Sequence, residues 1–262
     1  MGIEAFAEAA LCLLPGWQVE AVEDIAFLAP FKFYRGEPRA LRVETRIHPQ
    51  PRHPDRLAAD CRLIGYRSLP NQAEPQPTTH FTARVRLAKQ PVQAPAGKIW
   101  ATPNGSVIEA SDIYRLYFHG PAYQVVEKAW WDGKHIVGLM AQGLPPNHYP
   151  PELPAVMAPR LIELCFQTAG VWELGLQGRM GLPQRVREVS LFRSPALAES
   201  RMHAVVTPDA AQGSFDAEVL DTKGNCYLRL RGYRTVAVSD GVDTENLRIL
   251  QAIMAGEAAL VA

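Results

Sequence analysis

The stretch IELCFQTAG at residues 162–170 repeats the pattern of the stretch IEAFAEAA at residues 3–10. In each stretch an Ile-Glu pair is followed, after three residues, by Glu or Gln, and then by a small residue two positions further on. Both stretches are apolar nearly all round, which is typical of a helix that is buried on every side. The chain is therefore predicted to contain two related buried helices.

Strand-like segments follow each of these helices in the same order. They alternate between apolar and polar residues, and several of them end at a proline. The segments after the first helix are 22–30, 41–49, 57–67 and 80–88, and those after the second are 186–195, 202–208, 215–222 and 226–238. This ordered set, offset by about 160 residues, indicates an internal duplication.

A helix without a polar face needs a sheet that wraps around it. One buried helix followed by antiparallel strands predicts an α+β fold of the hotdog type, and two copies predict a double hotdog. We expect an N-terminal unit at residues 1–90 and a linker at 91–110 that is rich in Pro, Gly and Ala. A C-terminal unit should follow at 111–240, and a tail or helix at 241–262 with Thr244 as its N-cap.

The second copy has a segment before its helix that finds no counterpart in the first. Residues 123–143 predict a hairpin that turns at Asp132-Gly133, and a Pro-rich loop at 144–154 leads on to the helix. The comparison of the two copies predicts that the first unit lacks its N-terminal strands, and that about forty residues precede Met1 in a longer polypeptide.

Composition excludes several classes of function. The 262 residues contain 27 Lys and Arg and 27 Asp and Glu, so no basic excess indicates nucleic acid or a membrane surface as a partner. The apolar segment 3–14 is too short to span a membrane and lacks the basic start of a signal peptide. The spacing of cysteines and histidines fits no metal motif. We expect a cytoplasmic protein with reduced thiols, in which Cys12 and Cys165 are buried.

Two polar residues interrupt the apolar surface of the second helix. Glu163 and Gln167 are four residues apart and share one face. A carboxyl buried there is costly unless it is hydrogen-bonded or used, and in its protonated form it can donate a proton to a leaving hydroxyl. A structural pair that anchors the sheet is the alternative interpretation. On the first helix, Glu4 and Glu8 occupy the equivalent face, where the helix dipole favours glutamates near an exposed first turn; the alternative is that one of them orients a catalytic group.

The stretch IYRLYFHGPAYQVV at residues 113–126 places aromatic rings and a histidine at a Gly-Pro turn. Such a turn suits the mouth of a pocket that grips an extended acyl chain. A turn of core aromatic residues with a hydrogen-bonded histidine is the alternative interpretation.

These stretches resemble the dehydratase domains of polyketide and polyunsaturated fatty-acid synthases. YRLYFHGPAYQ is similar to the Phe-His-Gly-Pro-x-(Phe/Tyr)-Gln element of that family. APRLIELCFQTAG is similar to its second-hotdog helix, in which an acid precedes a Gln or His by four residues. MGIEAFAEAA resembles the helix after its His-x-x-x-Gly-x-x-x-x-Pro loop. The resemblance covers essentially the whole chain.

The resemblance implies a dehydratase that removes water from a 3-hydroxyacyl chain carried as a thioester on an acyl carrier protein. A His of the first unit would take the C2 proton, and an acid of the second unit would help the C3 hydroxyl to leave. Glu163 matches that acid, which is usually Asp in the family, and Gln167 matches the residue that orients it. The residues that match the substrate tunnel are Tyr117, His119, Gly120, Pro121 and Tyr123.

The family's base would lie before Met1, so the chain by itself is expected to be nearly inactive, since a general base contributes about 10²–10⁴-fold. The resemblance implies no resident cofactor, because phosphopantetheine arrives on the carrier protein. It implies other synthase domains as partners and leaves a homodimer open. Two alternatives stay open beside the dehydratase: a non-catalytic module that binds an acyl chain and its carrier protein, and a product-template-like domain.

Overall fold

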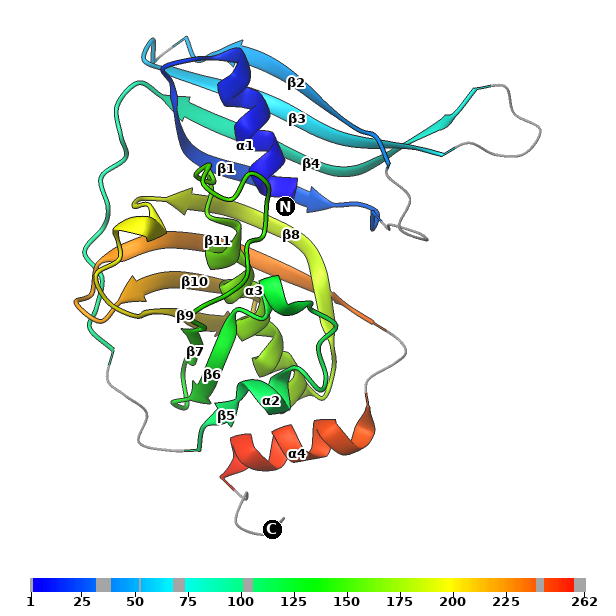
Figure 1. Cartoon of the computed structure of the whole chain (residues 1–262), viewed down its shortest axis with the longest axis vertical. Coiled ribbons are helices and arrows are strands. Elements are labelled where there is room, and N and C mark those ends of the chain that lie inside the picture. Colours follow the sequence, from blue (N-terminus) through cyan, green and yellow to red (C-terminus); the bar gives the residue numbers. More distant parts are fainter. Residues whose placement is uncertain are drawn as a thin grey trace.

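The computed structural model describes residues 2–31, 39–51, 53–67, 74–100, 106–238 and 243–256. Within these ranges, eleven strands form one antiparallel sheet, and two helices lie against it, one in each half (Figure 1). The predicted α+β double hotdog is confirmed. Met1, part of the predicted linker (101–105) and parts of the predicted tail (241–242 and 257–262) lie outside the described residues, and the predicted domain boundaries stay predictions.

The N-terminal unit is one helix followed by a four-stranded part of the sheet. Its elements are α1 (Gly2–Leu13), β1 (Gln18–Phe27), β2 (Leu41–Pro49), β3 (Arg56–Arg67) and β4 (Gln76–Ala88). The C-terminal unit contains β5 (Ile108–Glu109), the short helix α2 (Ala110–Ile113), β6 (Val126–Trp131), β7 (Ile136–Met140), α3 (Pro159–Trp172), β8 (Gly181–Leu191), β9 (Met202–Asp209), β10 (Ser214–Asp221) and β11 (Cys226–Ala237). Helix α4 (Thr244–Ala255) follows near the C-terminus and lies at the bottom of Figure 1.

The strand order bears out the internal duplication. The sheet runs β2-β3-β4-β1-β8-β11-β10-β9-β7-β6-β5. Strands β1 to β4 are the sequence counterparts of β8 to β11, so the two units are arranged with mirrored strand order around the β1–β8 junction. At this junction Val22 pairs with Val189 and Ile25 pairs with Val186. All four side chains are buried, so the two units share one continuous hydrophobic core.

The two central helices differ in how far the sheet encloses them. Ten of the fourteen residues of α3 are buried, as predicted for a helix with no free face. Helix α1 buries Ile3 and Phe6, but Glu8, Cys12 and Leu13 are exposed. The prediction that Cys12 is buried is therefore wrong, because α1 buries one face only, and Cys12 lies one turn after Glu8 on the opposite, exposed face. Cys165 on α3 is buried, as predicted.

The segments that frame α3 largely follow the prediction. Strands β6 and β7 form the expected hairpin, whose turn contains Gly133 at φ 90°. The predicted N-cap of α4 is wrong by one residue. Asp243, not Thr244, is the N-cap, because its carboxylate accepts the N–H groups of Glu245 and Asn246 at 2.9 and 3.1 Å. No helix in the described part of the chain is long and apolar enough to cross a membrane.

Candidate active site

Helix α3 and the turn before β6 form the candidate site. Pro159 begins α3, where its missing N–H leaves no helical hydrogen bond unmade. Glu163 and Gln167 then lie one turn apart on the same face. Opposite this face, Pro121 begins a 3-10 helical turn (Pro121–Tyr123), which directs the chain from His119 back towards β6. The two segments, far apart in sequence, meet at the carboxyl of Glu163.

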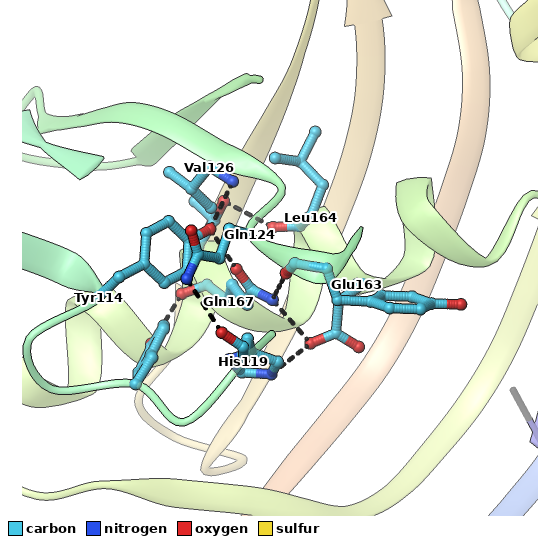
Figure 2. A network of polar contacts seen from close by, with 10 residues as sticks. Tyr114, His119, Gln124, Val126, Glu163, Leu164 and Gln167 are labelled. Carbon is cyan, nitrogen blue, oxygen red and sulfur yellow. Dashed lines mark hydrogen bonds and ion pairs between the residues drawn. The ribbon is translucent and has the colours of Figure 1, made fainter. Parts of the chain in front are cut away.

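The Glu163 carboxyl receives two contacts on the same oxygen. The Nε2 atom of Gln167 donates a hydrogen bond to Oε1 of Glu163 at 3.1 Å, and Nε2 of His119 lies 3.1 Å from the same atom (Figure 2). The side chains of His119 and Glu163 are 20% and 23% exposed. The carboxyl is thus only partly buried and is accessible to solvent. The apolar sequence of the helix predicts a more deeply buried carboxyl. Nδ1 of His119 is buried and has no hydrogen-bond partner among the described residues.

Tyr114 is a member of this network that sequence reasoning missed. Its hydroxyl donates to Oε1 of Gln167 at 2.8 Å and accepts the N–H of Val126, also at 2.8 Å. Burial raises the pKa of Tyr114, so the hydroxyl keeps its proton and stays a donor. Tyr114 belongs to the aromatic stretch before the Gly-Pro turn, but nothing in its spacing indicates that it reaches α3.

A small pocket of about 50 Å³ opens beside Glu163. This volume holds one or two water molecules. Phe118 lines the pocket, is 73% exposed and stacks on the ring of His119. The residues that line the pocket are Tyr117, Phe118, His119, Glu163, Phe166, Gln167, Gly170, Met180, Gly181, Leu182, Pro183 and Tyr233.

The structure brings some of the predicted tunnel residues to this pocket and leaves others beside it. Tyr117 and His119 line the pocket, and the hydroxyl of Tyr117 donates to the carbonyl of Gln167 at 3.0 Å. Tyr123 contributes its backbone carbonyl, which accepts a bond from Gln167 at 2.8 Å. Gly120 and Pro121 are exposed and shape the turn without lining the pocket. The substrate roles of all five remain predictions.

The helix-dipole interpretation predicts that Glu4 lies on an exposed first turn, and this prediction is wrong. It is 5% exposed, and its carboxylate accepts the backbone N–H groups of Val156 and Met157, the latter at 2.7 Å. These two residues lie immediately before α3. Glu4 therefore connects the N-terminal unit to the loop that leads into the candidate catalytic helix.

Among the described residues, His119 is the one histidine recorded in contact with Glu163. His48 contacts Asp60 at 2.9 Å, and His80 contacts the carbonyl of Ala29 at 3.1 Å, both in the N-terminal unit. No group of three or more potential metal ligands occurs in the described part of the chain.

Comparisons with known proteins agree on one family. The sequence profile described as "PS-DH: Polyketide synthase dehydratase N-terminal domain" matches residues 110–245, more than half of the chain. The dehydratase domain from the CurF module of curacin polyketide synthase is 17% identical, with a TM-score of 0.70 over 90% of this chain and 83% of that one. No curated protein matches the sequence significantly.

Two further solved structures share the fold. A dehydratase domain of a trans-AT polyketide synthase from Brevibacillus brevis is 17% identical, with a TM-score of 0.68 over 89% of this chain and 83% of that one. The dehydratase domain of MlnD from Bacillus amyloliquefaciens is 15% identical, with a TM-score of 0.65 over 89% of this chain and 82% of that one. At these identities the likeness concerns the fold.

Proposed function

The chain belongs to the polyketide synthase dehydratase family, and on that premise we propose that it removes water from a 3-hydroxyacyl chain carried as a thioester on an acyl carrier protein. Dehydration in polyketide synthesis is what the family does. The carrier-bound substrate, its use in polyketide or fatty-acid synthesis, and the other synthase domains as partners are parts of the proposal. Phosphopantetheine would arrive with the carrier protein, and no resident cofactor is proposed.

The observation that carries this proposal is the carboxyl of Glu163. It projects from α3 beside a pocket, accepts a hydrogen bond from Gln167 on Oε1, and has Nε2 of His119 at 3.1 Å from the same oxygen. A carboxyl held in this way can give up a proton and then be stabilised as a carboxylate by the NH₂ group of Gln167 and by His119 in the form that carries a proton on Nε2. The family usually has Asp at this position. The extra methylene of Glu163 lengthens the reach of the acid and leaves its chemistry unchanged.

The reaction requires one base and one acid. The base takes the proton from C2, the C3–O bond breaks, and Glu163 donates its proton to the leaving hydroxyl, so that water departs and a C2–C3 double bond remains. We assign the base to a histidine upstream of Met1, as the family resemblance implies. Tyr117 and His119 would line the path of the acyl chain, with Tyr123 holding Gln167 through its backbone.

The test compares this chain with a form extended upstream by about forty residues, the length that the internal repeat suggests. Each is mixed with a 3-hydroxyacyl carrier protein, and loss of one water from the acyl chain is followed by mass spectrometry. Dehydration in the extended form alone supports the proposal and its assignment of the base. If neither form dehydrates while both still bind the acylated carrier, the proposal is wrong, and a binding or product-template-like role replaces it.

A further inference from the structure

A chain of hydrogen bonds leads from the backbone of β6 through Tyr114 and Gln167 to Glu163. The first donor in this chain determines which group donates in the next bond. The backbone N–H of Val126 can only donate, so the oxygen of Tyr114, 2.8 Å away, accepts that bond. The hydroxyl proton of Tyr114 is then free to be donated to Oε1 of Gln167 at 2.8 Å (Figure 2). Tyr114 therefore requires the carbonyl end of the Gln167 amide to face it.

The backbone of Tyr123 fixes the same orientation independently. A carbonyl oxygen can only accept, so the end of Gln167 that lies 2.8 Å from the carbonyl of Tyr123 is the NH₂ group. The same NH₂ group donates to Oε1 of Glu163 at 3.1 Å. Rotation of the amide by 180° would set its carbonyl oxygen against two acceptors and its NH₂ group against the donor of Tyr114. The orientation is thus determined by chemistry as well as by fit.

Two side-chain nitrogen atoms lie close to the same oxygen of Glu163. Nε2 of Gln167 and Nε2 of His119 each lie 3.1 Å from Oε1. The described residues make no recorded hydrogen bond to Oε2, which carries no dashed contact in Figure 2. The NH₂ group of Gln167 can only donate, so Oε1 accepts that bond whichever nitrogen of His119 carries a proton. In a protonated carboxyl, the oxygen that accepts is the carbonyl-like one, and the proton resides on the other. The proton of Glu163 is accordingly expected on Oε2.

We propose that Tyr114 is a positioning residue of the dehydration: it holds the NH₂ group of Gln167 towards Oε1 of Glu163 and so leaves Oε2 as the oxygen that gives its proton to the leaving hydroxyl. This inference rests on the proposed function. The step balances, since the Oε2–H bond breaks as an O–H bond of water forms. The negative charge then spreads over the carboxylate, to which the NH₂ group of Gln167 already donates and beside which Nε2 of His119 lies.

The first test is a double-mutant cycle on the form of the protein that dehydrates. Tyr114→Phe removes one of the two contacts that orient the Gln167 amide and leaves the bond to the carbonyl of Tyr123, so the amide is held less firmly, and kcat should fall on the order of tenfold while KM stays within about twofold. Because Tyr114 acts through Gln167, the same substitution should cost nothing further in a Gln167→Ala background. The matched control is Tyr227→Phe, which removes a buried hydroxyl that contacts Asp221 and should leave kcat unchanged.

The second test does not depend on activity. In ¹⁵N-labelled chain, the side-chain NH₂ signals of Gln167 are identified by their loss in Gln167→Ala. We expect Tyr114→Phe to shift this pair of signals and Tyr227→Phe to leave them in place. Unchanged Gln167 signals in Tyr114→Phe, an unchanged kcat, or additive effects in the cycle would each overturn the inference. If no form dehydrates, the proposed function fails by itself, and the NMR result still decides whether Tyr114 orients Gln167.

Discussion

Glu4 accepts the N–H of Met157 at 2.7 Å and thereby joins the helix of one hotdog unit to the start of the central helix of the other. The two residues are 153 positions apart in the sequence. The same carboxylate also accepts the N–H of Val156. A single buried side chain therefore binds two backbone N–H groups in the segment that leads into α3.

Removal of this carboxylate should destabilise the protein markedly. Glu4→Ala leaves two backbone N–H groups without their acceptor, and each such loss costs about 1–3 kcal/mol. We expect the free energy of unfolding to fall by about 2–4 kcal/mol, measured as a lower urea midpoint with an unchanged m-value. Glu152→Ala, at an exposed position of the loop before α3, is the matched control and should change it by less than about 0.5 kcal/mol. Equal effects of the two substitutions would show that the Glu4 contact does not stabilise the fold.

Stability should depend on pH through His203. This side chain is buried in β9, and burial lowers the pKa of His203 below the value of about 6.5 expected for an unfolded chain, although Asp221 opposes the shift. Below pH of about 6.5 the unfolded chain binds a proton that the folded chain does not. The free energy of unfolding therefore falls as the pH drops, by at most about 1.4 kcal/mol per pH unit.

The measurement is a series of urea denaturations between pH 8 and pH 5. His203→Gln should flatten the acid side of the curve, whatever its stability at pH 8. His53→Gln, at an exposed position, should retain the wild-type slope. A His203→Gln curve parallel to that of the wild type would exclude His203 as the source of the acid sensitivity.

The close approach of Tyr117 to α3 depends on a glycine. A Cβ atom at Gly170 would lie 2.3 Å from the hydroxyl oxygen of Tyr117, which is buried and bonded to the carbonyl of Gln167. Gly170→Ala should therefore destabilise the protein by about 1–3 kcal/mol. Combining it with Tyr117→Phe removes the clashing atom and should recover part of that loss. Thermal denaturation should show a lower Tm for Gly170→Ala and a Tm closer to that of Tyr117→Phe for the double variant.

Gly120→Ala serves as the control for this pair, because nothing lies within 4 Å of a Cβ there and its φ of −71° suits any residue. It should melt close to the wild type. If Gly170→Ala also melts like the wild type, the side chain of Tyr117 can shift to make room for the added methyl group, and the predicted clash is wrong.

The sequence predicts the elements of this fold better than the contacts among them. The repeated helix motif and the ordered strands lead directly to the double hotdog, because period and order are local properties of the chain. The enclosure of α1 is predicted less well, since the sheet covers only one face of this helix and Cys12 lies on the other. The N-cap at Asp243 instead of Thr244 is a choice between two adjacent residues that both cap well.

The candidate site shows the same division. Glu163 and Gln167 are predicted from their shared helical face, and the structure places them 3.1 Å apart, oxygen to nitrogen. Tyr114 is not predicted, because its bond to Gln167 spans 53 residues and depends on how the turn before β6 lies across α3. Glu4 has the right residue type at the repeat-related position, but its partners are backbone groups that no side-chain pattern marks.

The most direct measurement is the rate of water loss from a 3-hydroxyacyl carrier protein by the dehydrating form, with Glu163 intact and as Glu163→Gln. A glutamine fits the same space but cannot supply the proton, so the rate should fall by about 10²–10⁴-fold, with binding of the acylated carrier retained. Glu163→Asp, which restores the acid usual in the family, should keep a measurable rate. A Glu163→Gln variant that dehydrates at the full rate would contradict the assignment of Glu163 as the acid on which this account of the site rests.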